Sequence, residues 1–86
     1  MNTTDEIRAF VRSNFYVPDD LVLGDETSLL DLGIVDSTGV LEIVSFLEGR
    51  FGVTVDDLEI VPENLDSVAR IADFLARKQS AELQTA

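Results

Sequence analysis

The sequence predicts an all-α fold, a small four-helix bundle of three main helices and one short helix, with a long loop between the first two. Apolar residues recur at helical spacing in three separate segments, and no segment alternates long enough to make a strand. The chain has 86 residues, of which 45% are hydrophobic, enough for one small domain with a core. We expect that domain to cover residues 1–80, followed by a flexible tail over residues 81–86.

The first helix is predicted from Thr3 or Thr4 to about Phe15. Thr3 and Glu6 have the spacing of a capping box, in which each side chain binds a backbone N–H at the helix start. Pro18 ends the segment, because the residue before a proline avoids helical geometry. The apolar stripe consists of Ile7, Phe10, Val11 and Phe15.

Residues 16–36 form the predicted long connection. A loop of about 20 residues without secondary structure is uncommon in a compact domain, so it should be functional or held down. The residues from Ser28 to Asp31 predict one short helical turn that Gly33 closes. We expect the loop to be held by Leu21, Leu23, Leu29, Leu30, Leu32, Ile34 and Val35.

The second helix is predicted from Asp36 or Ser37 to Arg50 or Phe51, with Gly52 as its stop. Its core stripe consists of Val40, Val44, Leu47 and Phe51, widened by Ile43. The opposite side carries Thr38, Leu41, Glu42, Ser45, Glu48 and Gly49.

Two further helical segments complete the prediction. A short turn is expected between Asp56 and Val61, ended by Pro62. The last helix begins near Asp66 or Ser67. Its apolar stripe consists of Val68, Ile71, Ala72 and Leu75, and no pattern continues after residue 78.

The composition excludes several kinds of site. The chain has no His and no Cys, which excludes zinc sites, Ser-His-Asp and Cys-His catalysis, iron–sulfur clusters and disulfides. An EF-hand is excluded because Leu21 and Leu23 stand where a loop beginning at Asp19 needs oxygen ligands. We therefore expect a protein that is not an enzyme, with no catalytic residues and no metal.

The net charge of −11 argues against partners that are nucleic acid or anionic membrane. No apolar run approaches the ~20 residues of a membrane span, and the opening residues are no signal peptide, so we expect a cytoplasmic protein without membrane insertion. Between Ser13 and Ala69 the only basic residue is Arg50, against thirteen acidic residues. This stretch is either a solvated surface kept soluble by like charge or a docking face for basic partners.

Two serines, Ser37 and Ser67, each follow an aspartate at the start of a predicted helix. The ordinary role of a serine there is an N-cap. At Ser37 the position three residues later is Val40, where a capping box has Glu or Gln. The other interpretation is an attachment site, because a phosphate would meet free backbone N–H groups and the positive end of the helix dipole. Physical reasoning on the sequence leaves both interpretations open for both serines.

Residues 29–37 read LLDLGIVDS, and this run resembles the phosphopantetheine attachment motif of acyl carrier proteins, an apolar-Gly-apolar-Asp-Ser signature. Residues 47–52, LEGRFG, resemble the ending of the helix that follows that motif. The resemblance continues through residues 62–67, PENLDS, and covers roughly residues 3–78. It places Ser67 at the cap of the family's last helix.

The resemblance implies that Ser37, preceded by Asp36, carries a 4′-phosphopantetheine arm, which a separate transferase adds from coenzyme A with magnesium. The terminal thiol of that arm would hold an acyl group as a thioester. Loading ligases and acyl-processing enzymes would dock basic patches against the acidic second helix. The residues implied in docking are Thr38, Leu41, Glu42, Ser45 and Glu48.

The implied function is that of a discrete, monomeric acyl carrier protein for fatty acid, polyketide or related biosynthesis. One alternative is an aminoacyl carrier resembling D-alanyl carrier proteins. Fatty-acid carriers usually have Leu and an acidic residue where this chain has Thr38 and Gly39, and a glycine at the second of these positions resembles D-alanyl carrier proteins. The other alternative is an unmodified acidic helical adaptor that binds a basic partner.

Overall fold

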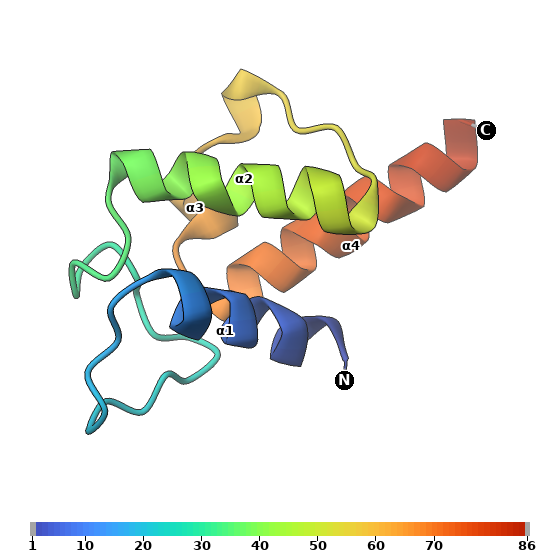
Figure 1. Cartoon of the computed structure of the whole chain (residues 1–86). Coiled ribbons are helices and arrows are strands. Elements are labelled where there is room, and N and C mark those ends of the chain that lie inside the picture. Colours follow the sequence, from blue (N-terminus) through green and yellow to red (C-terminus); the bar gives the residue numbers. More distant parts are fainter. Residues whose placement is uncertain (1, 86) are drawn as a thin grey trace.

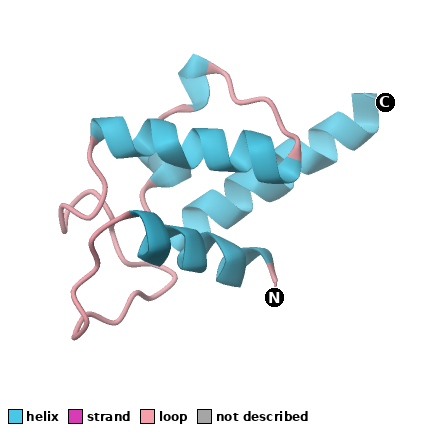
Figure 2. Cartoon of the chain, in the orientation of Figure 1, coloured by secondary structure: helices cyan, strands magenta, loops and turns pink. Residues whose placement is uncertain are grey.

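The computed structural model describes residues 2–85 and shows a bundle of four α-helices with one 3₁₀ turn (Figures 1 and 2). In chain order the elements are α1 (Thr3–Asn14), α2 (Ser37–Phe51), η1 (Asp57–Glu59), α3 (Pro62–Leu65) and α4 (Val68–Thr85). No strand occurs within residues 2–85, and none of the helices there has the length and apolar character needed to cross a membrane. The predicted all-α bundle, with one short helix and a long first connection, is confirmed.

The start of α1 differs from the prediction in its cap. The side chain of Asn2 accepts a hydrogen bond of 2.8 Å from the backbone N–H of Asp5, so Asn2, and not Thr3, is the N-cap. The predicted stripe is confirmed, since Ile7 and Val11 are buried.

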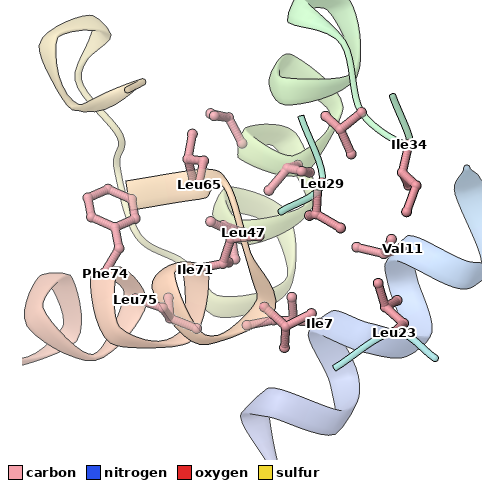
Figure 3. Packing of buried hydrophobic residues seen from close by; sticks show 14 of the residues in the cluster. Ile7, Val11, Leu23, Leu29, Ile34, Leu47, Leu65, Ile71, Phe74 and Leu75 are labelled. Atoms are coloured by element: carbon pink, nitrogen blue, oxygen red, sulfur yellow. The ribbon is translucent and has the colours of Figure 1, made fainter. Parts of the chain in front are cut away.

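The core lies between α1, α2 and α4, with part of the long connection packed into it (Figure 3). The apolar faces predicted for α2 and α4 point inward, although Phe74 is a core residue that the predicted stripe omits. The buried side chains of these helices are Ile7, Val11, Ile43, Val44, Leu47, Val68, Ile71, Phe74 and Leu75. Burial of these faces is the main stabilising contribution of the fold.

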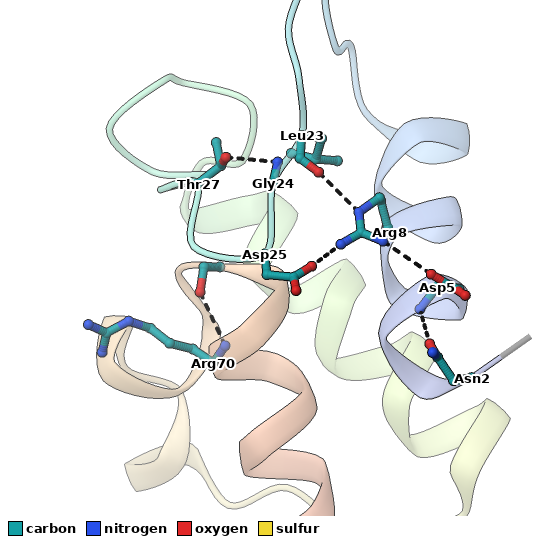
Figure 4. A network of polar contacts seen from close by, with 9 residues as sticks. Asn2, Asp5, Arg8, Leu23, Gly24, Asp25, Thr27 and Arg70 are labelled. Atoms are coloured by element: carbon teal, nitrogen blue, oxygen red, sulfur yellow. Dashed lines mark hydrogen bonds and ion pairs between the residues drawn. The ribbon is translucent and has the colours of Figure 1, made fainter.

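Arg8 holds the first half of the long connection against α1 (Figure 4). Its Nε donates to the carbonyl of Leu23 at 3.0 Å, and its guanidinium pairs with the carboxylates of Asp5 and Asp25. The carbonyl of Asp25 in turn accepts from the N–H of Ala69 at 2.8 Å. This half of the loop is therefore tied to both α1 and α4.

Asp66 holds the second half of the connection, close to the start of α2. Its carboxylate accepts from the Ser28 hydroxyl at 2.8 Å and from the Leu30 N–H at 3.0 Å, and its carbonyl accepts from the Leu29 N–H at 2.7 Å. Of the residues expected to hold the loop, Leu32 is 54% exposed, so that expectation is wrong for Leu32. Four others are buried, namely Leu23, Leu29, Ile34 and Val35.

Pro62 begins a helix, which corrects the prediction that it only ends one. Proline suits the first helical position, because its missing N–H would have no partner there. The preceding turn, η1, has a capping box of Asp56 and Glu59, and Lys78 of α4 pairs with Glu59 at 2.9 Å. The N–H of Asp56 and then the Lys78 ammonium hold the pKa of the Glu59 carboxyl below its ordinary value.

The last helix is longer than its apolar stripe indicated. It continues to Thr85, through residues for which the sequence predicted a tail. Residues 79–85 contain no Gly or Pro, and Gln, Ala, Glu and Leu are good helix formers, so nothing in the chain stops the helix there. Ala86 lies outside the described residues.

Candidate functional site: the start of helix α2

Asp36 caps α2, so the side chain of Ser37 is not needed as the N-cap of this helix. The Oδ1 atom of Asp36 accepts a hydrogen bond of 2.8 Å from the N–H of Gly39. Ser37 is the first helical residue and is exposed, and its hydroxyl has no hydrogen-bond partner among residues 2–85. The interpretation of Ser37 as an N-cap is therefore wrong, and its hydroxyl is available for chemistry.

Ser67 shows the opposite arrangement. Its side chain is 2% exposed, and its Oγ accepts from the N–H of Arg70 at 3.1 Å. It caps α4, as the sequence analysis assigned, and cannot be reached by another protein. The two Asp-Ser starts, which the sequence left equivalent on physical grounds, thus differ in burial and in the partner of the hydroxyl.

Replacing Asp36 by Ala should cost about 0.5–2 kcal/mol of unfolding free energy, because an N-cap acceptor is lost. Asp36→Asn should lose far less, since the amide oxygen can still accept from Gly39. Urea denaturation of the three proteins measures this. A matched control is Asp31→Ala, also an exposed aspartate of the preceding loop. Equal midpoints for Asp36→Ala and the wild type would mean that another group caps α2.

Gly39 is buried beneath the ring of Phe15, which follows α1. A Cβ atom at position 39 would lie 2.7 Å from Phe15 Cε1 and 3.2 Å from Val35 Cγ1, closer than carbon atoms pack. A glycine therefore stands in the first turn of α2 because the end of α1 packs against that turn. The sequence did not indicate this contact, because it joins residues far apart in the chain.

Gly39→Ala should destabilise the protein by about 1–3 kcal/mol through overpacking, although alanine gains up to ~1 kcal/mol of helix propensity. In a Phe15→Ala background the same substitution should cost less, because the ring is gone and the tightest remaining approach is 3.2 Å to Val35 Cγ1. A double-mutant cycle of unfolding free energies measures the coupling. Additive effects of the two substitutions would show that Phe15 does not require the glycine.

An apolar hollow of about 230 Å³ adjoins Ser37. It lies between the start of α2, the long connection and the segment that leads into α3. Ser37 is the only polar residue that lines it within the described part of the chain. The other lining residues are Leu30, Val40, Ile60, Val61, Pro62 and Leu65. A flexible apolar chain attached at Ser37 would find sheltered surface here.

All five residues implied in docking are exposed on α2, namely Thr38, Leu41, Glu42, Ser45 and Glu48. Glu48 and Glu42 differ in their contacts, which the sequence did not indicate. The Oε2 atom of Glu48 accepts from the N–H of Val55 at 3.0 Å, so Glu48 also holds the loop after α2. Glu42 has no hydrogen bond or ion pair with any described residue. Leu41 is 55% exposed, beside this free carboxylate.

Comparison with known proteins gives the family of the chain. The chain matches the family described as "Phosphopantetheine attachment site" over residues 5–75. It is 32% identical over 71 residues to acyl carrier protein 1, chloroplastic, from Casuarina glauca. That alignment covers 83% of this chain and 48% of the relative, so the chain spans about half the length of this curated relative.

Proposed function

Because the chain belongs to the acyl carrier protein family, whose members carry phosphopantetheine and are not catalysts, we propose that Ser37 is the attachment residue. The observation that supports this most is the free, exposed hydroxyl at the first position of α2, with Asp36 as the cap. Backbone N–H groups of the first turn and the positive end of the helix dipole favour a phosphate at this position.

The contribution of this chain to the attachment reaction is the exposed hydroxyl of Ser37. The Ser37 oxygen would bond to the phosphorus of the phosphopantetheine part of coenzyme A, the pyrophosphate bond would break, and adenosine bisphosphate would leave. The proton of the hydroxyl would pass to a base of the transferase. When bound, the arm supplies a thiol that holds an acyl group as a thioester, which explains how a chain without Cys or His takes part in acyl chemistry.

We further propose an apolar acyl cargo, as in fatty acid or polyketide biosynthesis. The hollow beside Ser37 has an apolar lining apart from Ser37 itself. An aminoacyl cargo would bring an ammonium group, and burying that charge without a partner is costly. The aminoacyl alternative rests on Gly39, and the packing of Phe15 gives that glycine a reason unrelated to cargo.

The experiment that tests the proposed function is a change in mass. The purified chain is incubated with coenzyme A, magnesium and a broad-specificity phosphopantetheinyl transferase and is then weighed by mass spectrometry. We expect the mass to rise by one phosphopantetheine group per chain. An unchanged mass would favour the unmodified acidic adaptor. Loading of the modified chain with an apolar acyl group or with alanine by matched ligases then tests the cargo.

We propose that partners dock basic patches on the exposed face of α2. Glu42→Lys should therefore slow modification of Ser37 and flatten its salt dependence, because charge steering acts on the association rate. The melting temperature should stay equal or rise, since Glu42 has no partner among the described residues and the chain carries excess negative charge.

The matched control is Glu26→Lys, an exposed acidic residue beside the first turns of α4. It changes the net charge equally and should leave the modification rate near that of the wild type. Glu48→Lys is a poorer probe, because it also removes the bond to Val55. Equal modification rates for Glu42→Lys and the wild type from low to high salt would show that the transferase does not bind this face of α2.

A further inference from the structure

The segment before Ser37 closes on itself at one backbone carbonyl. The carbonyl of Leu29 accepts hydrogen bonds from the N–H of Ile34 at 3.0 Å and from the N–H of Val35 at 3.2 Å. All three side chains are buried, and Leu29 and Ile34 are labelled in the view of the core (Figure 3). Since Asp36 and Ser37 follow directly, the position of Leu29 determines where the chain enters α2.

Leu29 is in turn held by Asp66, which joins the end of α3 to the start of α4. The carbonyl of Asp66 accepts from the Leu29 N–H at 2.7 Å. Its carboxylate accepts from the Leu30 N–H at 3.0 Å, and from the Ser28 hydroxyl at 2.9 Å on Oδ1 and 2.8 Å on Oδ2. Asp66 and Ser28 are half-buried, and hydrogen bonds to a carboxylate that is partly withdrawn from water are among the stronger ones in proteins. One residue therefore fixes three consecutive residues of the long connection.

The closed segment also packs against the first turn of α2. A Cβ atom on Gly39 would lie 3.2 Å from Val35 Cγ1, so Val35 is in close contact with this turn. Asp36 caps the same turn through the N–H of Gly39. The hydroxyl of Ser37 has no hydrogen bond with any described residue, so its position depends on the backbone on either side of it.

The carboxylate of Asp66 reaches two further features near Ser37. Leu30, whose N–H it binds, lines the apolar hollow from the connection, and Leu65, the residue before Asp66, lines it from α3. The Oγ atom of Ser28 accepts from the N–H of Asp31 at 3.2 Å, so the bond between Asp66 and Ser28 extends to the exposed turn of the segment. Removal of this carboxylate would loosen the segment at several points together.

We propose that Asp66 is a positioning residue for the attachment reaction, because its carboxylate holds residues 28–35 in the arrangement in which the transferase binds Ser37. The inference rests on the proposed attachment at Ser37. Without the carboxylate the segment samples several arrangements, and the apparent affinity of a partner falls with the fraction of chains that are ready to bind. Once the transferase is bound, the reacting atoms are the same. The loss therefore acts on KM and not on kcat.

The test measures the rate at which the transferase modifies the full chain, as a function of chain concentration, with saturating coenzyme A and magnesium. Asp66→Ala should raise KM about tenfold, the value of one hydrogen bond to a charged group, and leave kcat within about twofold of the wild type. Asp66→Asn should stay close to the wild type, since the amide oxygen can still accept from Leu30 and Ser28. Alanine suits the backbone of Asp66, which is helical at φ −79° and ψ −15°.

Amide hydrogen exchange gives a second readout that needs no transferase. The N–H groups of Ile34 and Val35 should exchange about tenfold faster in Asp66→Ala, relative to the N–H of Val11 in α1 of the same sample. A general loss of stability speeds exchange in α1 as well, so this exchange ratio reports on the segment alone. Asp66→Asn should restore the ratio of the wild type.

Two control variants separate positioning from stability. Ser67→Ala changes the neighbouring residue, whose hydroxyl caps α4 through the N–H of Arg70. Asp25→Ala makes the same substitution in the first half of the long connection, where it removes the ion pair with Arg8 (Figure 4). Both variants should lose stability and keep the KM and the exchange ratio of the wild type.

Ser28→Ala keeps the test decisive if Asp66→Ala does not fold. It removes the two bonds from the Ser28 hydroxyl to the carboxylate and leaves the bond from Leu30. KM and the exchange ratio should change in the same direction as for Asp66→Ala, by a smaller factor. Wild-type values of both for Ser28→Ala would then overturn the proposal.

The positioning role is overturned if folded Asp66→Ala keeps the wild-type KM or exchange ratio, or if its kcat falls while KM stays constant. It is also overturned if Asp66→Asn behaves like Asp66→Ala, or if either control variant raises KM equally. These outcomes are distinct from failure of the proposed function. A wild-type chain that gains no mass overturns the attachment and this role together, whereas a mass gain with an unchanged KM for Asp66→Ala overturns the positioning role alone.

Discussion

Ser37→Ala should abolish the mass increase with coenzyme A and leave the free energy of unfolding within about 0.5 kcal/mol of the wild type, as for ordinary surface substitutions. The substitution removes only the hydroxyl group, and no described residue forms a hydrogen bond with it. An N-cap role would have predicted a loss of about 0.5–2 kcal/mol, but that role belongs to Asp36. Mass spectrometry and urea denaturation of the same preparation measure both effects.

Ser67→Ala is the matched control, because it makes the same change after another Asp at the start of another helix. It should destabilise the protein by about 0.5–2 kcal/mol and leave the mass increase intact, since Ser67 is buried and caps α4. A mass gain that survives Ser37→Ala but is lost in Ser67→Ala would refute the assignment of the attachment residue.

The helices could be predicted from the sequence because their apolar faces repeat at short, regular spacing. The same local pattern identified the outer face of α2, including Leu41 and Glu42. Caps were less certain, because neighbouring polar residues can each accept the same backbone N–H: Asn2 replaces Thr3 on α1, and Asp36 replaces Ser37 on α2.

What the sequence could not show are contacts between distant residues. The packing of Phe15 against Gly39 explains why a glycine stands in the first turn of α2. Neither the sequence around Phe15 nor the sequence around Gly39 indicates this contact. Asp66 holding Ser28 and Leu30 is similar: an Asp before a helix predicts a cap, yet its carboxylate fixes the loop that precedes Ser37. Sequence motifs thus indicated Ser37 as the proposed attachment residue, while its free hydroxyl and the apolar hollow beside it depend on tertiary packing.

Leu47→Ala should destabilise the protein by about 2–5 kcal/mol, the range for removing a buried leucine side chain and leaving a cavity. Leu47 is 0% exposed and lies in the core with residues of α1 and α4 (Figure 3). Domains of this size sit at the low end of the ~5–15 kcal/mol stability of native proteins, so much of the variant should be unfolded near physiological temperature. Circular dichroism during urea denaturation measures the loss.

Leu41→Ala is the matched control for the effect of burial. It makes the same substitution on the same helix, at a position that is 55% exposed. It should change the unfolding free energy by less than about 0.5 kcal/mol. It should instead weaken docking of partners, since an exposed apolar residue beside a free carboxylate is suited to anchor them. If the two variants lost equal stability, or if Leu47→Ala unfolded like the wild type, α2 would present a different face to the core. The positions of the proposed attachment serine, of the outer face and of the apolar hollow beside Ser37 would then have to be assigned again, because all three depend on the rotation of this one helix.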